Sequence, residues 1–164
     1  MPGYYCAMDI KELIISQSVK NSNELFHAAR KVPADKLTWR PLDAGRHVLD
    51  LCQECALSPL WSVEMLHSRR CPDFTPEMMA EFEAMKEKLT DLDACEAACK
   101  KNLETLAEAV RAFPDADWGS TLTLPWGVEK EYSFAAIGMI HYWNAVYHTG
   151  QVNYIQTLYG DHSM

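Results

Sequence analysis

Four polar side chains recur at intervals of three and four residues near the C-terminus, inside an otherwise apolar stretch. They are His141, Asn144, His148 and Gln151. At 100° per residue, a helix places all four side chains within about 40° of one line along its surface. Burying a polar group without a partner costs about 1 to 3 kcal/mol, so such a stripe needs a hydrogen-bond network, internal water or a metal ion. We expect these side chains to point into the protein.

A metal site is one way to satisfy this stripe. Asn144 and His148 are four residues apart, so their side chains leave one helix face one turn apart and can share a cation. A neutral amide oxygen is a weak ligand, and another helix must therefore supply a further donor. Glu54 is the natural candidate, because it lies close to the apolar sector of its own predicted helix, where a lone carboxylate is costly. The predicted metal ligands are Glu54, Asn144 and His148.

Neighbouring residues complete the predicted site. His141 lies one turn before Asn144 and could replace it as a ligand, and Gln151 is a further metal-binding or pocket candidate. Trp143 and Tyr147 lie in the adjoining sector of the helix, and we expect them to form a pocket wall. In the absence of a metal, the polar stripe is expected to bond other side chains or water.

Helical patterns must position these residues. Helices are predicted over residues 9–31, 46–68, 75–113 and 134–159. Asp9 and Ser133 are the expected N-caps of the first and last helices, and Gly160 ends the last one. Pro59 is expected to kink or break the second helix, because proline lacks a backbone donor and collides with the preceding turn. The third pattern is expected to divide between residues 89 and 93.

The stretch "STLTLPWGVEKEYS" differs from these helical patterns. It contains β-formers on both sides of Pro125 and Gly127, which predicts a small hairpin or an extended crossover before the last helix. The chain carries neither an internal repeat nor a low-complexity linker. We therefore predict an all-α, up-down four-helix bundle that forms a single domain over residues 1–164.

Composition excludes some partners. The chain has a formal charge of -8, and its 15 Lys and Arg residues are dispersed among 23 Asp and Glu residues, so no basic stripe is available for nucleic acid. The N-terminal stretch lacks the pattern of a signal peptide, and no segment approaches the ~20 apolar residues that a membrane span requires. A cytoplasmic protein with reduced cysteines is expected.

The cysteines offer a rival metal site. Two pairs, Cys52 with Cys55 and Cys95 with Cys99, each lie on one face of a predicted helix, and four thiolates from two helices could hold zinc in a tetrahedral site. However, the first pair lies in an apolar stripe, and free cysteine is among the most frequently buried residues. Zinc-binding pairs also come from turns more often than from helix interiors. We therefore favour four core thiols.

Three stretches resemble the DinB-like family, which includes YfiT-like hydrolases and thiol-dependent S-transferases. They are "TWRP", "LPWG" and "NAVYHTGQVNYI". The last helix of that family offers a His, three residues, and a second His followed by x-Gly-Gln. Here the first position is Asn144 and the second is His148. A third family ligand, a His on the second helix, falls at Glu54, or at Gln53 if the correspondence shifts by one residue.

The resemblance implies a metal-dependent enzyme. In such a site a divalent ion activates a thiol or water for transfer or hydrolysis on a small electrophilic substrate, and a low-molecular-weight thiol is an implied cosubstrate. The ion could be zinc, nickel, manganese or iron, and one imidazole, one carboxylate and one amide shift the preference toward manganese or iron. The alternative is a metal-free helical bundle that binds a small molecule or is associated with stress, without catalysis.

An uncharged face of the last helix predicts self-association. Tyr142, Val146, Asn153 and Thr157 lie opposite the polar stripe and carry no charge. A solvated helix of an acidic protein would normally place Lys or Glu at such positions. We therefore expect a homodimer with this face at its interface.

Overall fold

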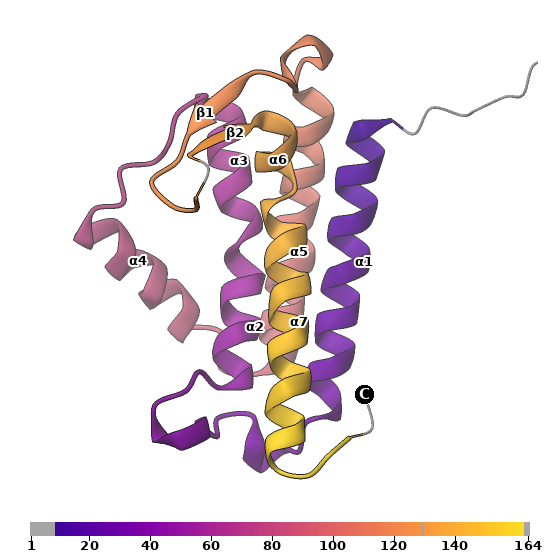
Figure 1. The fold of residues 1–164 in the computed structure, drawn as a ribbon, viewed down its shortest axis with the longest axis vertical. Coiled ribbons are helices and arrows are strands. Elements are labelled where there is room, and N and C mark those ends of the chain that lie inside the picture. Colours follow the sequence, from indigo (N-terminus) through magenta and orange to yellow (C-terminus); the bar gives the residue numbers. More distant parts are fainter. Residues whose placement is uncertain (1–8, 129, 163–164) are drawn as a thin grey trace, which may run out of the picture.

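Long helices run side by side in the computed structural model, which describes residues 9–128 and 130–162 (Figure 1). They are α1 (Ile10–Lys31), α5 (Leu92–Ala112), α7 (Ile140–Leu158) and the consecutive pair α2 (Val48–Leu57) and α3 (Pro59–Ser68). Helix α1 packs on α5 and α7, α5 packs on both α2 and α3, and α2 packs on α7. The predicted all-α class is confirmed.

The shorter elements surround these helices. They are α4 (Pro76–Glu87), α6 (Phe134–Gly138), β1 (Thr121–Thr123), β2 (Glu131–Ser133) and 3-10 turns over Ala34–Lys36, Pro41–Asp43 and Asp115–Asp117. Helix α4 stands off the side of α2 (Figure 1). Strands β1 and β2 pair antiparallel, with Leu122 opposite Tyr132. The predicted hairpin before the last helix is therefore confirmed.

Helix ends follow the expected capping chemistry. The Asp9 side chain accepts a hydrogen bond from the amide of Lys11, and the Ser133 side chain accepts one from the amide of Ala136. Both predicted N-caps are confirmed. The break at Pro59 is also confirmed, because α2 ends at Leu57 and α3 begins at the proline.

Two helix boundaries differ from the prediction. The second helix begins at Val48 rather than Arg46, because the ring of His47 caps it by accepting from the amide of Asp50. The last helix is not continuous: Met139 separates α6 from α7. At the end of α6 the chain passes so close to α1 that a Cβ on Gly138 would lie 2.9 Å from Cδ1 of Ile14. Glycine permits this approach.

The core contains the four cysteines of the proposed rival metal site. Cys52 and Cys55 on α2 and Cys95 and Cys99 on α5 are buried, free thiols. Burial raises the pKa of each thiol, to about 12 for Cys95 and about 11 for Cys99. These side chains are therefore neutral and pack as small apolar groups. Cys6 lies outside the residues that the structure describes.

The surface of α7 corrects one prediction. Tyr142, Asn153 and Thr157 are only partly exposed, and of the predicted outward face Val146 alone is exposed. The most exposed large side chains of this helix are instead Trp143, Tyr147, Tyr154 and Leu158. The outward face is thus rotated toward the aromatic sector that sequence analysis placed beside the polar stripe. Among the described residues, no helix has the length and hydropathy needed to cross a membrane.

Candidate functional site

Helices α2 and α7 bring Glu54 and His148 into contact. Oε1 of Glu54 lies 3.1 Å from Nε2 of His148, whose side chain is buried. Burial alone would raise the pKa of Glu54, but the hydrogen bond from His148 and the charge of Arg46 outweigh it and hold that pKa at about 2. Glu54 is therefore a carboxylate at neutral pH. Two of the three predicted metal ligands thus face each other.

Gln151 holds the other side of the same ring. Nδ1 of His148 lies 2.5 Å from Oε1 of Gln151, one turn further along α7. An amide oxygen can only accept, so Nδ1 must carry a proton and donate it to this bond. The bond fixes the orientation of the ring and turns Nε2 toward Glu54. Gln151, which the sequence offered as a metal or pocket residue, therefore positions His148.

A network of ion pairs holds the second carboxylate oxygen of Glu54. Arg46 contacts Oε2 of Glu54 at 2.7 Å and Oδ2 of Asp50 at 2.6 Å. Lys86, a buried residue of α4, contacts Oδ1 of Asp50 at 2.8 Å. Burial would raise the pKa of Asp50, but bonds from Arg46 and Lys86 hold it at about 2. This network was not predicted from the sequence. The spacing of four residues from Arg46 to Asp50 to Glu54 nevertheless indicates that the three side chains share one face of the predicted helix.

His141 belongs to a separate hydrogen-bond set. Its Nε2 lies 2.7 Å from Oγ of Ser22 on α1, and its Nδ1 lies 2.6 Å from Oγ of Ser58, at the junction of α2 and α3. The ring is fully buried, and burial lowers its pKa to about 4, so it is neutral at pH 7. Both nitrogens are therefore already engaged with hydroxyl groups. In this structure His141 links three helices instead of facing Glu54.

The two remaining candidates differ in position. Asn144 lines a pocket that Glu54 and Ser58 also line, so it lies close to Glu54. Gln53 donates a hydrogen bond to the backbone oxygen of Leu89 at 2.9 Å, between α4 and α5. The structure thus brings Asn144 to the same pocket as Glu54 and gives Gln53 a different partner.

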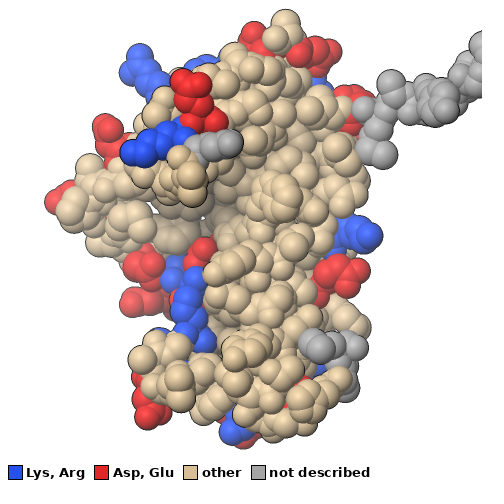
Figure 2. Space-filling view, in the orientation of Figure 1, with Lys and Arg blue, Asp and Glu red and all other residues tan. Residues whose placement is uncertain are grey.

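An aromatic pocket of about 420 Å³ opens beside Glu54 and Asn144. Its walls come from α3, α4, the hairpin and the segment between α3 and α4, and the hollow beside α4 is visible in Figure 2. The aromatic lining residues are Trp61, Phe74, Phe82 and Trp126. Trp61 packs on both phenylalanine rings, with ring centres 5.1 and 5.3 Å away. Such walls suit a flat or apolar small molecule.

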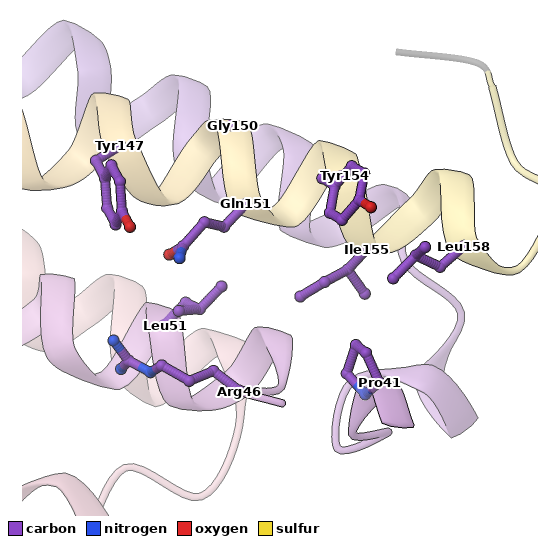
Figure 3. A pocket seen from close by; sticks show the side chains of 9 residues that line it. All are labelled: Pro41, Arg46, Leu51, Tyr147, Gly150, Gln151, Tyr154, Ile155 and Leu158. Atoms are coloured by element: carbon purple, nitrogen blue, oxygen red, sulfur yellow. The ribbon is translucent and has the colours of Figure 1, made fainter. Parts of the chain in front are cut away.

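A second pocket, also of about 420 Å³, is lined by Arg46, which contacts Glu54, and by Gln151, which contacts His148. Figure 3 shows Gln151 and Ile155 projecting from α7 toward Arg46 and Leu51 on the α2 side. Tyr147, which was predicted to form a pocket wall, is among the residues that line this pocket. Trp143 is 61% exposed and is not among the lining residues of either pocket described here.

The donor set fits a weakly held, hard cation. Two ligands at about 2.0–2.2 Å from one ion stand roughly 3 Å apart, which matches the spacing of Nε2 and Oε1. Asn144, the third predicted ligand, lines the same pocket as Glu54. Within residues 9–128 and 130–162, no three His, Cys, Asp or Glu side chains group in a way that could hold a metal. The positive charge of the neighbouring Arg46 would lower the affinity for any cation, and the oxygen donors would favour manganese or iron over zinc.

Comparison with known proteins identifies a fold. No family model and no curated protein sequence matches the chain. Among solved structures, the mycothiol-dependent maleylpyruvate isomerase is similar, with a TM-score of 0.66 and 14% sequence identity over 87% of this chain. The matched region is 60% of the isomerase, so this chain spans well under the full length of that enzyme. At this identity the likeness shows a shared fold and nothing more.

Proposed function

We propose that the chain is a DinB-like four-helix-bundle enzyme in which Glu54, Asn144 and His148 hold a divalent ion. The observation that carries this proposal is the 3.1 Å approach of His148 Nε2 to Glu54 Oε1, with Gln151 fixing the opposite ring nitrogen. A histidine that presents one nitrogen to a site while the other donates to an oxygen has the usual geometry of a metal ligand. The wall of the aromatic pocket lies next to these donors.

The chemistry follows from the residues around the donors. When bound, a divalent ion supplies positive charge that favours the deprotonated form of a thiol or water at neutral pH. Gln151 keeps the proton on Nδ1, and Arg46 holds the second oxygen of Glu54, so both donors keep one orientation. The aromatic rings exclude water from one side of a bound substrate.

A thiol-dependent reaction is the form of this activity that we favour. The isomerase that shares the fold depends on mycothiol, a thiol cofactor. This chain has two pockets of similar volume, one lined by Glu54 and the other by Arg46 and Gln151, the contact partners of Glu54 and His148, and they provide space for a thiol cosubstrate and a small electrophilic substrate. We propose that the Glu54–His148 pair supports either the transfer of a thiol to an electrophilic substrate or the hydrolysis of that substrate.

A second candidate function is metal-free binding of a small molecule. It is favoured by the contacts already made within the site: Glu54 and Gln151 each contact one ring nitrogen of His148, and Arg46 contacts the remaining oxygen of Glu54. A site with all its polar groups paired needs no ion for stability.

Calorimetric titration of untagged, chelator-treated protein with Mn²⁺ and Zn²⁺ separates the two candidates. The enzyme proposal predicts one ion per chain in the wild type and loss of binding in His148→Ala. His27→Ala is the matched control, because His27 is an exposed histidine of α1. If the wild type binds neither ion, or if His148→Ala binds as well as His27→Ala, the metal site is refuted.

A further inference from the structure

Helix α7 carries an exposed, uncharged stripe along its length. We define this α7 stripe by Trp143, Val146, Tyr147, Gly150, Tyr154 and Leu158. Its three aromatic side chains are 61 to 65% exposed, which is unusual for large rings in a folded chain. Figure 2 shows the surface over α7 as a band without Lys, Arg, Asp or Glu, with charged side chains on both flanks. Contiguous apolar surface of this kind marks an interaction site.

The length of the stripe points to a macromolecular partner. From residue 143 to residue 158 the helix rises about 24 Å at 1.5 Å per residue. The pocket beside it takes in only Tyr147, Gly150, Tyr154 and Leu158 of the stripe, and leaves Trp143 and Val146 outside its lining. A small molecule seated in that pocket would therefore leave the first turn of the stripe uncovered.

Gly150 provides an independent indication of close approach by another backbone. It lies in the middle of α7, where glycine costs about 1 kcal/mol of helix stability relative to alanine. Apart from its two chain neighbours and the nearby backbone of α7 itself, no atom of the described chain lies within 4 Å of the place where its Cβ would be, unlike at Gly138, where Ile14 of α1 fills that space. The fold itself therefore gives no packing reason for this glycine. A small residue flanked by Tyr147 and Tyr154 forms a notch into which a second helix can pack.

Charge and area select a second copy of this chain as the partner. The chain has a net charge of -8, so two copies repel unless they meet through an uncharged surface, which the stripe provides. Aromatic side chains present about 150 to 250 Å² each, so three rings exposed by three-fifths contribute roughly 300 to 500 Å². A stable dimer buries about 800 Å² per partner; Val146 and Leu158, which are 39% and 46% exposed, add a part of the difference, and residues flanking the stripe must supply the rest.

We propose that two copies form a homodimer by crossing their α7 helices at Gly150, with the stripes packed face to face. This arrangement is compatible with two-fold symmetry, because both copies contribute the same stripe to the interface. Because Tyr147, Gly150, Tyr154 and Leu158 also line the pocket beside Arg46, the second copy covers the mouth of that pocket. Dimerisation thus encloses one of the two spaces next to the Glu54–His148 pair. The proposal does not depend on a bound metal.

Size-exclusion chromatography with light scattering tests this dimer between about 5 and 200 µM protein. The wild type is expected to elute with twice the mass of the chain. Gly150→Gln should weaken dimerisation by at least about tenfold, because a long side chain fills the notch. Gly119→Gln is the matched control: Gly119 also has no atom within 4 Å of its Cβ position, but it lies outside the α7 stripe. It should remain dimeric.

A second variant keeps the test decisive if Gly150→Gln fails to fold, which circular dichroism would show. Tyr154→Glu places two like charges in the contact and should give monomers with wild-type helix content. A wild type that is monomeric at every concentration overturns the proposal, and so does a dimer that persists unchanged in both folded variants. A monomer whose exposed tryptophan fluorescence responds only to small molecules would assign the stripe to a ligand instead.

Discussion

The Nε2 atom of His148 lies 3.1 Å from Oε1 of Glu54, although 94 positions separate the two residues in the chain. This contact joins α2 to α7 and lies beside two pockets. Gln151 contacts the other ring nitrogen of His148, and Arg46 contacts the other carboxylate oxygen of Glu54. Each of these neighbours makes a separate, measurable contribution to the site.

Replacing Gln151 should weaken metal binding without removing it. Gln151→Ala leaves Nδ1 of His148 without its acceptor, so the ring loses its fixed orientation and Nε2 is less basic. We expect Mn²⁺ affinity to fall by about 10- to 100-fold in calorimetric titrations. Asn153→Ala, two residues further along α7, is the control. Equal affinity in both variants would show that Gln151 has no positioning role.

Restoring an imidazole at position 144 should tighten the site. Asn144→His replaces a weak amide donor by a strong one in the same pocket as Glu54, so we expect affinity for Zn²⁺ or Ni²⁺ to rise by at least about tenfold. Asn153→His adds an imidazole to the same helix outside this pocket and should leave the affinity unchanged. No gain from Asn144→His would place residue 144 outside the coordination shell.

The Glu54 carboxylate should contribute to acid stability. Its pKa falls from 4.5 to about 2 on folding, so its contribution is present above pH ~4.5 and is lost as the pH falls toward 2. Glu54→Gln should lower the free energy of unfolding at pH 7 by about 2 kcal/mol, and this deficit should shrink below pH ~4. Urea unfolding across this range measures the effect. Glu24→Gln, at an exposed position of α1, should show no such trend.

The lowered pKa of His141 should cause a second loss of stability at acidic pH, separate from that of Glu54. Its pKa falls from 6.5 to about 4 in the folded protein, so the unfolded chain takes up a proton first as the pH is lowered. Stability should therefore decrease by up to about 1.4 kcal/mol per pH unit between pH ~6.5 and ~4. His141→Gln should flatten this part of the profile, whatever its stability at pH 7. An unchanged slope in the variant would assign the effect to another group.

Much of the fold was predictable from local chemistry. Asp9 and Ser133 have the side chains that cap helices, and Pro59 cannot continue one, so these boundaries follow from the residues themselves. The break at Met139 was not predicted; it lies next to Gly138, which closely approaches Ile14 of another helix. Tertiary contacts of this kind leave no periodic signal in a single sequence.

The candidate site was predictable in part. The contact between Glu54 and His148 follows the expectation that a carboxylate close to an apolar helix face needs a polar partner. The roles of His141 and Gln53 could not be predicted, because their partners, Ser22, Ser58 and the backbone of Leu89, lie on other elements. The exposure of Tyr147 and Tyr154 was missed because aromatic residues usually indicate burial, whereas here they form the α7 stripe.

Locating an ion by anomalous diffraction tests the central claim most directly. Crystals of the untagged protein grown with Mn²⁺ should show one anomalous peak about 2.0–2.3 Å from both Nε2 of His148 and Oε1 of Glu54, with the amide oxygen of Asn144 as the third protein donor. Crystals of His148→Ala should lack this peak. The absence of any peak between Glu54 and His148 in wild-type crystals soaked with excess Mn²⁺, or a peak only elsewhere, would contradict the metal site.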